Sequence, residues 1–213
     1  MIGLIGKKLG QTRIYDSNGS AIHVTVVHAG PNHVIQCKSA DKDGYTAVQL
    51  GFDEQKAQRL NKPQTGHLTS NGSVSPIRQV KEFRDFSIEV KPGDALNVDI
   101  FAEGDFIDAI GKTKGKGFQG VVRRYGFGGG RKSHGQKGWY RRPGAISSGS
   151  TPGWVPKGTK LPGHMGQRRR TVQNLRIARV LADENLLLIE GAVPGAKGDY
   201  LVIRESKKKP KKQ

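Results

Sequence analysis

The stretch Ile22-His23-Val24-Thr25-Val26-Val27, IHVTVV at residues 22–27, indicates the class of fold of this chain. Five of its six residues are β-branched, and β-branched side chains favour the extended backbone of a strand. Asn18-Gly19 lies between this stretch and Arg13-Ile14-Tyr15, and Asn-Gly is typical of the two-residue turn of a β-hairpin. The start of the chain therefore predicts a β-hairpin.

Further segments of the same kind occur toward both ends of the chain. Short alternating or β-branched runs predict strands at residues 45–50, 96–100, 175–181, 186–190 and 200–204. A short helix is expected over Asp53–Leu60, ended by Asn61-Lys62-Pro63. Turns are expected at residues 182–185 and 193–198. Many short strands with glycine-rich turns are typical of an antiparallel barrel or sandwich, here built from both ends of the chain.

The positive charge of the chain is concentrated in one segment. The formal net charge is +18, from 36 Lys and Arg against 18 Asp and Glu. Between Asp108 and Asp183, residues 109–182 hold 17 Lys or Arg and no acidic residue, and the rest of the chain is nearly neutral. A solvated surface normally mixes both signs, so a segment of one sign predicts a polyanionic partner.

Several classes of protein are disfavoured by what the sequence lacks. Cys37 is the single cysteine, so neither an internal disulfide nor a thiolate zinc site is expected. The opening MIGLIGKK has no signal-peptide pattern, and no apolar run reaches the roughly 18 residues of a membrane span. The six histidines form no metal-binding motif. We expect a soluble intracellular protein with no metal, cofactor, membrane contact or small-molecule substrate.

Residues 126–166 show neither helical nor alternating periodicity. An irregular stretch above about 15 residues is usually functional or disordered, and disordered linkers seldom carry aromatic residues such as Trp139, Tyr140 and Trp154. Folded back on itself, the stretch could reach roughly 60 Å at about 3.3 Å per residue. We expect an extended arm that inserts into another molecule. For Trp154, which lies between two nearby prolines, the alternative is that it anchors the arm to its own barrel.

Glycine-rich motifs in the basic segment resemble nucleotide-binding loops. Gly115-Lys116-Gly117-Phe118-Gln119-Gly120 fits GxGxxG, but a dinucleotide site needs an acidic residue about 20 positions later, and none occurs before Asp183. Gly111-Lys112-Thr113 resembles the end of a phosphate-binding loop, yet Phe106 stands where its first glycine belongs. We therefore interpret these glycines as residues that let the backbone approach a nucleic acid closely.

The candidate RNA-binding residues are basic side chains that can reach phosphates and aromatic rings that can stack on unpaired bases. They are Lys7, Lys8, Arg13, Lys112, Lys114, Lys116, Arg123, Arg124, Arg131, Lys132, Lys137, Trp139, Arg141, Arg142, Trp154, Lys157, Lys160, Arg168, Arg169 and Arg170. No catalytic residue is predicted.

Two other functions fit part of this pattern. A DNA-binding architectural protein would also use an acid-free arm, but no DNA-reading motif is visible. An RNA-modifying enzyme with a basic substrate channel would need a base or nucleophile near its substrate, and an acid-free arm offers only histidine, such as His134.

Several stretches of the chain resemble the bacterial L3 family of large-subunit ribosomal proteins. They are MIGLIGKKLGQTRIY at residues 1–15, the run from Phe101 through Gly120 to Arg124, Pro143-Gly144 followed by Thr151-Pro152-Gly153, Gly163-His164-Met165-Gly166, and Leu186–Gly195. The resemblance covers essentially the whole chain apart from its lysine-rich end. Many members carry a methylated glutamine just before Thr-Pro-Gly. Ser150 stands at that position here, so no such modification is expected.

The resemblance implies a mainly β fold: an antiparallel β-barrel like those of translation proteins, with a small α/β insertion and a long extended basic arm. It also implies a non-catalytic, cytoplasmic constituent of the ribosome. Such a protein binds large-subunit 23S rRNA, contacts neighbouring ribosomal proteins, acts early in assembly and supports the geometry near the peptidyl-transferase centre. We expect residues 1–108 and 171–205 to form the globular part, 109–170 the basic region with its arm at about 126–166, and 206–213 a flexible lysine-rich tail.

Overall fold

The computed structural model of the chain describes residues 1–70 and 75–209. The chain divides into two compact units, one formed by Met1–Thr113 with Arg169–Gln213 and the other by Lys114–Arg168. The first unit thus combines both ends of the sequence, and the second is one continuous insertion. Part of the expected lysine-rich tail, residues 210–213, lies outside the described residues.

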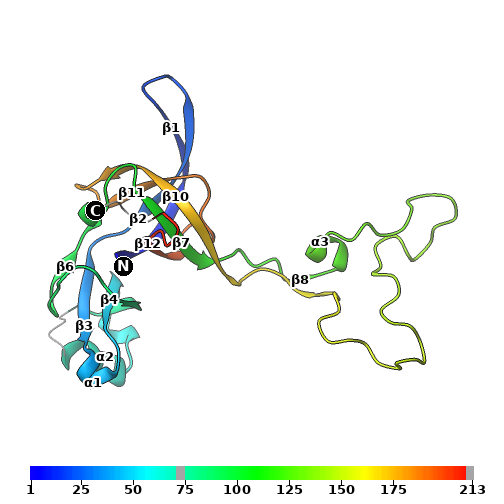
Figure 1. Ribbon diagram of the computed structural model, residues 1–213, viewed down its shortest axis with the longest axis horizontal. Coiled ribbons are helices and arrows are strands. Elements are labelled where there is room, and N and C mark those ends of the chain that lie inside the picture. The colour runs from blue at the N-terminus through cyan, green and yellow to red at the C-terminus, as the bar shows by residue number, and fades with distance from the viewer. Residues whose placement is uncertain (71–74, 210–213) are drawn as a thin grey trace. The chain divides into compact units, whose positions relative to one another are not determined.

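A closed antiparallel barrel forms the centre of the first unit (Figure 1). Its strands are β1 (Gly3–Tyr15), β2 (Ala21–His28), β7 (Phe106–Lys112), β10 (Arg169–Leu181), β11 (Leu186–Glu190) and β12 (Tyr200–Glu205). Their order around the barrel is β1-β12-β7-β10-β11-β2, and β2 closes the barrel against β1. The expected barrel built from both ends of the sequence is therefore confirmed.

The β1–β2 hairpin follows from the local sequence around Asn18-Gly19. The two strands pair over residues 7–15 and 21–28, and Gly19 has a φ of +75° in the connecting turn, a conformation that glycine adopts without steric cost. Val24 and Val27 of the IHVTVV stretch are 1% and 0% exposed. The predicted hairpin is confirmed, and burial of these β-branched side chains in the barrel stabilises it.

A four-stranded sheet with short helical segments is inserted between β2 and β7. Its strands, in the order β5-β4-β3-β6, are β3 (Asn32–Lys38), β4 (Ala47–Glu54), β5 (Ile77–Arg84) and β6 (Ala95–Leu96). The helical segments are α1 (Ala40–Asp43), the 3₁₀ turn η1 (Ala57–Arg59), α2 (Lys62–Ser70) and the 3₁₀ turn η2 (Val98–Ile100), which precedes β7. The expected small α/β insertion is thus confirmed.

The prediction of a helix over Asp53–Leu60 is wrong. β4 continues through Glu54, which lies opposite Ile77 of β5, and the segment that follows forms only the short turn η1. Asn61-Lys62-Pro63, expected to end a helix, begins α2 instead, since the Thr65 N–H donates to the Asn61 carbonyl at 3.0 Å. Proline is tolerated in a first helical turn because its missing N–H would have no intrahelical partner there.

The strand expected at residues 96–100 is also wrong beyond Leu96, where β6 ends. The chain then forms η2, after which the Phe101 N–H donates to the Val98 carbonyl at 3.0 Å. Val98 and Phe101 are 0% and 6% exposed. A tight turn, rather than a strand, therefore buries the apolar residues of this segment.

One hydrophobic core joins the barrel and the inserted sheet. Leu4 and Ile107 contribute to it from the barrel, and Leu50 and Phe83 contribute from the sheet. In a smaller cluster, Leu68 of α2 packs against Ile35 of β3 and Ile77 of β5. Because burial of apolar surface is the main stabilising contribution to folding, the barrel and the inserted sheet stabilise each other.

Asp53 and Tyr200 form a polar link between the inserted sheet and the barrel. The Tyr200 phenol on β12 donates a hydrogen bond to the Asp53 carboxylate on β4, and the Lys7 ammonium lies 3.4 Å from the same carboxylate. Partial burial opposes ionisation of Asp53, but the hydrogen bond from Tyr200 and the charge of Lys7 outweigh it and lower the pKa of Asp53. Burial and the hydrogen bond to Asp53 raise the pKa of Tyr200 to about 12.

We expect Tyr200→Phe to lower the free energy of unfolding by about 1 kcal/mol at neutral pH, the usual size of one lost hydrogen bond. The pKa of Tyr200 is raised to about 12 in the folded chain, against about 10 in an unfolded one. The contribution is therefore fully present below pH 10 and is lost as the pH rises toward 12. Urea unfolding of both proteins between pH 7 and 12 measures this difference. A difference that does not change with pH would contradict the Tyr200–Asp53 hydrogen bond.

Candidate nucleic-acid interface

Two paired segments form the stem of the second unit. Its strands are β8 (Phe118–Gln119) and β9 (Gly163–His164), and α3 (Val121–Tyr125) follows β8. The Lys116 N–H donates to the Met165 carbonyl, and the Met165 N–H donates to the Gly117 carbonyl, both at 2.9 Å. These bonds hold the beginning and the end of the Lys114–Arg168 unit together.

Glycine allows a close backbone contact in this stem. Gly166 has a φ of +83°, and a Cβ atom there would lie 2.1 Å from the Lys114 carbonyl oxygen. No other residue fits without moving the backbone. The GxGxxG motif at residues 115–120 begins in the same stem, and α3 behind it has only five residues. A dinucleotide site would also need an acidic residue about 20 positions later, and the sequence that follows has none. The glycines of the motif therefore have a structural role in the stem.

After α3 the chain forms two successive loops without helix or strand (Figure 1). The first, named the basic loop, spans residues 129–142 and is closed by the Gly130 N–H, which donates to the Tyr140 carbonyl at 3.0 Å. The Arg142 guanidinium lies 5.1 Å from the centre of the Trp139 ring, a cation–π contact that covers part of this ring. The exposed cations of the loop are Arg131, Lys132, Lys137, Arg141 and Arg142.

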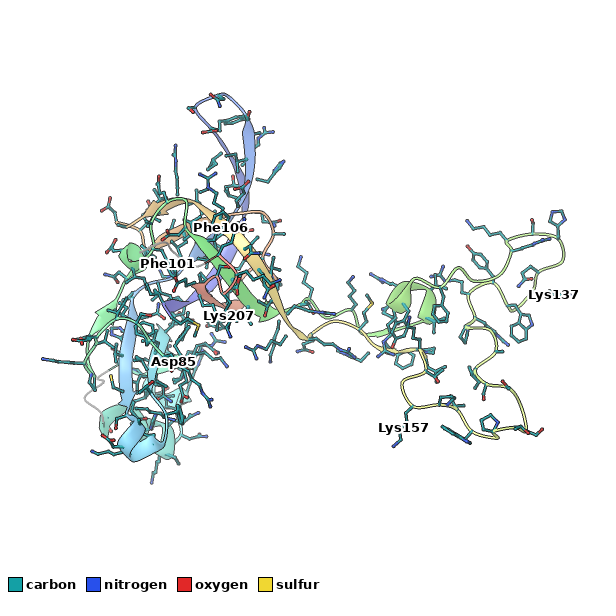
Figure 2. The ribbon with its side chains drawn as sticks, in the orientation of Figure 1. Asp85, Phe101, Phe106, Lys137, Lys157 and Lys207 are labelled. Carbon is teal, nitrogen blue, oxygen red and sulfur yellow. The ribbon has the colours of Figure 1, made fainter. Side chains whose placement is uncertain are left out.

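The second loop, named the uncharged loop, spans residues 143–156 and contains no Lys, Arg, Asp or Glu. The Ser147 hydroxyl donates to the Trp154 carbonyl at 3.1 Å and closes the loop. In Figure 2, Lys137 marks the basic loop and Lys157 follows the end of the uncharged loop. The Trp154 side chain is 61% exposed.

The second unit carries twelve positive charges, six lysines and six arginines, and no acidic residue. No carboxylate within the unit can neutralise these cations, and a binding polyanion would relieve their mutual repulsion. Nearly all of the cations predicted between residues 112 and 170 are exposed. The exposed ones are Lys112, Lys114, Lys116, Arg123, Arg131, Lys132, Lys137, Arg141, Arg142, Lys157, Lys160, Arg168, Arg169 and Arg170.

A like-charge pair lies at the ends of β7 and β10. Lys112 on β7 is directly opposite Arg169 on β10 in the antiparallel ladder, and Arg170 follows it. Like charges at opposite positions of a sheet destabilise the pairing. An anion bound between these two strands would remove that cost, so the pair is suited to a bridging phosphate.

Three of the predicted RNA-binding residues are buried or partly buried, and their charged groups make hydrogen bonds inside the protein. Lys8 is 8% exposed and its ammonium donates to the Val193 and Gly195 carbonyls at 3.0 and 3.2 Å. The prediction for Lys8 is therefore corrected: this side chain stabilises the turn before β12. Lys7 pairs with Asp53, as described above. Arg124, on α3, is half-buried and donates to the Leu161 carbonyl at 2.6 Å, which ties α3 to the returning segment.

The exposed aromatic rings of the second unit were only partly predicted. Trp139 and Trp154 are 59% and 61% exposed, but Phe118, omitted from the predicted site, is 75% exposed. Its position between basic and glycine residues of the acid-free segment is the signal that could have identified it. The Tyr125 ring makes cation–π contacts within the unit, with Arg124 at 5.0 Å and Lys160 at 6.0 Å from its centre. Among the described residues, Phe118 and Trp154 have no aromatic or cationic partner.

Comparison with known proteins places the chain in a family. Residues 79–185 match the profile of the family described as Ribosomal protein L3. The chain is 50% identical over 208 residues to the large ribosomal subunit protein uL3 of Deinococcus radiodurans, which covers 98% of this chain and 96% of that relative. The chain belongs to the ribosomal protein L3 family. It is also 48% identical over 211 residues to the uL3 protein of Akkermansia muciniphila, covering 98% of this chain and 99% of that relative.

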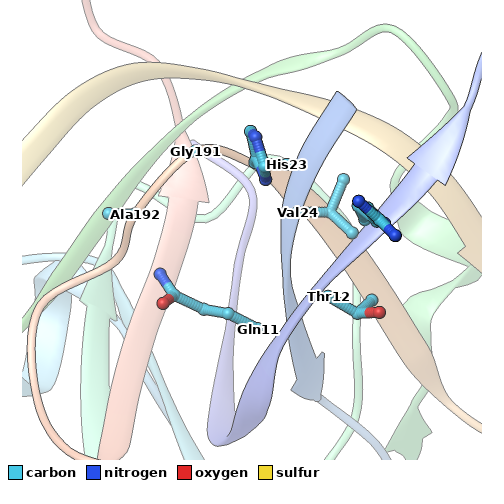
Figure 3. A pocket seen from close by; sticks show the side chains of 7 residues that line it. Gln11, Thr12, His23, Val24, Gly191 and Ala192 are labelled. Carbon is cyan, nitrogen blue, oxygen red and sulfur yellow. The ribbon is translucent and has the colours of Figure 1, made fainter. Parts of the chain in front are cut away.

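An open depression of about 510 Å³ lies on the barrel of this L3-family chain (Figure 3). Its lining residues come from β1, β2 and the segment at Gly191 and Ala192, and they include Arg13 and His23. An anion bound on this surface could contact one guanidinium and one imidazole.

Over residues 1–70 and 75–209, no three His, Cys, Asp or Glu side chains are grouped to hold a metal ion. No helix in these ranges is long and apolar enough to span a membrane.

Proposed function

We propose that this chain is a structural, non-catalytic constituent of the large ribosomal subunit and binds 23S rRNA directly through its Lys114–Arg168 unit. The observation that carries the proposal is the charge of this unit, twelve cations without one carboxylate. Membership of the L3 family, and the names of relatives as large-subunit proteins, support the ribosomal setting. The protein would act in the cytoplasm, within the ribosome and beside other large-subunit proteins.

In this function the exposed cations neutralise phosphates and release bound counterions, which supplies most of the affinity. Lys112 and Arg169 would bridge a phosphate at the barrel, while the stem and the basic loop would hold RNA segments together. Residues 109–170 would be the RNA-binding region, 1–108 and 171–205 the globular part, and 206–213 a flexible tail. Neutralisation of RNA repulsion would serve early assembly, and the arm would support the geometry of a peptidyl-transferase centre made of RNA.

The salt dependence of binding tests this proposal. The affinity of the full chain for a 23S rRNA transcript and for duplex DNA is measured over a series of KCl concentrations. We expect the transcript to be bound at least about tenfold more tightly, with an affinity that falls steeply as salt rises. Equal affinities would favour an architectural DNA-binding protein. An affinity independent of salt would contradict phosphate contacts.

A further inference from the structure

The uncharged loop differs chemically from the sequence on either side of it. Residues 143–156 carry no charge, whereas Arg141 and Arg142 come just before them and Lys157 just after. A contact with a phosphate depends on a cation or another strong donor. The loop has neutral hydroxyls instead, among them the exposed Ser150 and Thr151. Because it has no charged side chain, the loop cannot neutralise phosphates as the basic loop can, and its contacts with a partner must depend on neutral groups.

Trp154 is the main contact group that the uncharged loop offers. Its side chain is 61% exposed, and among the described residues no aromatic ring or cation lies over it. Trp139 differs, because Arg142 covers its ring at 5.1 Å. The hydrogen bond from Ser147 holds the Trp154 backbone at 3.1 Å. The indole is thus presented on a closed loop, which reduces the entropy lost when a partner binds.

We propose that an unpaired base of the RNA stacks on Trp154, so that the uncharged loop is a base-binding site between two phosphate-binding segments. This inference rests on the proposed rRNA binding. Charge complementarity identifies the partner, since Arg141, Arg142 and Lys157 at the ends of the loop require a polyanion next to it. An indole stacks on any base, and neutral hydroxyls suit base edges and the 2′-hydroxyl. An apolar protein surface would not account for the flanking cations.

Fluorescence of Trp154 tests whether a base stacks there. The full chain has two tryptophans, so Trp139→Phe leaves Trp154 as the single reporter and keeps an aromatic ring at 139. With a 23S rRNA transcript bound, we expect the Trp154 emission to be quenched and its collisional quenching by acrylamide to fall. A fully duplex RNA of similar length should leave both nearly unchanged, because it has no unpaired base to offer.

Affinity measurements in the same background separate stacking from charge. We expect Trp154→Ala to weaken binding of the transcript about 5- to 150-fold, the range expected for loss of one stacked base. The slope of log affinity against log salt should stay unchanged, and Trp154→Phe should retain most of the affinity. Leu181→Ala is the matched control: Leu181 is 40% exposed but lies beside the acidic turn of Asp183 and Glu184, so it should change nothing.

The outcomes distinguish this inference from the proposed function. Salt-dependent rRNA binding with Trp154 still accessible to acrylamide, and with full affinity in Trp154→Ala, overturns the stacking site alone. A Trp154→Ala variant with a smaller salt slope also overturns it, because the loop would then act through phosphate contacts. If the unaltered chain does not bind the transcript, both the inference and the proposed function fail.

Discussion

Asp108→Ala is expected to lower the free energy of unfolding of the chain by about 3 kcal/mol, the scale for breaking a buried ion pair by removing one partner. The Asp108 carboxylate is 1% exposed, lies 3.3 Å from the Arg204 guanidinium and accepts the Asn174 N–H at 3.2 Å. Alanine would leave both donors without this acceptor. We place the effect at the low end of the usual range because the Arg204 side chain is 19% exposed. Urea unfolding followed by circular dichroism measures it.

Asp183→Ala provides the matched control for this prediction. It removes the same group from the exposed turn between β10 and β11, where we expect a change within about 0.5 kcal/mol. If the two variants unfolded at the same urea concentration, the Asp108–Arg204 pair would have no net stabilising role in the barrel.

Neutralising the basic loop should have the largest effect on RNA binding. In a variant with Arg131, Lys132, Arg141 and Arg142 changed to glutamine, up to four phosphate contacts are lost. We expect the log–log salt slope to fall by about three to four units and the affinity near 0.1 M salt to fall about 10³-fold. Titration of a 23S rRNA transcript at several salt concentrations gives both values.

A second variant with the same change in net charge shows whether position matters. Lys56, Arg59, Lys62 and Lys81 are exposed cations of the inserted sheet, and changing all four to glutamine should weaken binding much less. Equal losses from the two variants would mean that RNA responds to the total charge of the chain and that the basic loop is no specific contact.

Local sequence was sufficient where an element depends on its own residues. The β-branched stretch at 22–27 and the turn at Asn18-Gly19 are enough to predict their hairpin, although its stability also depends on burial in the barrel. Glu54 was expected in a helix because nothing near it in the sequence reveals its pairing with Ile77 of β5. Val98 likewise turns into the core because of contacts that are distant in sequence. In both places, contacts with residues distant in the sequence outweighed the local preference for helix or strand.

The candidate site could be predicted as far as charge determines it. The acid-free segment is visible in the sequence, and its cations are exposed apart from Arg124. Lys8 could not be separated from them, since its burial depends on carbonyls of Val193 and Gly195 that lie far along the chain. The division of the arm into a basic and an uncharged loop was visible in the sequence too. Trp154 is among the RNA-binding residues predicted from the sequence, but its exposure could not be predicted from the sequence alone.

In the topology of the barrel, the whole Lys114–Arg168 unit is the connection between two neighbouring strands, β7 and β10. β7 ends at Lys112 and β10 begins at Arg169, and these residues face each other in one ladder. The free-energy cost of closing a flexible loop, which is entropic, rises by only about 0.6 kcal/mol for each doubling of its length. Insertions, deletions and changes of composition in this unit therefore cost the barrel little. Selection for folding and selection for binding can then act on different residues of the same chain.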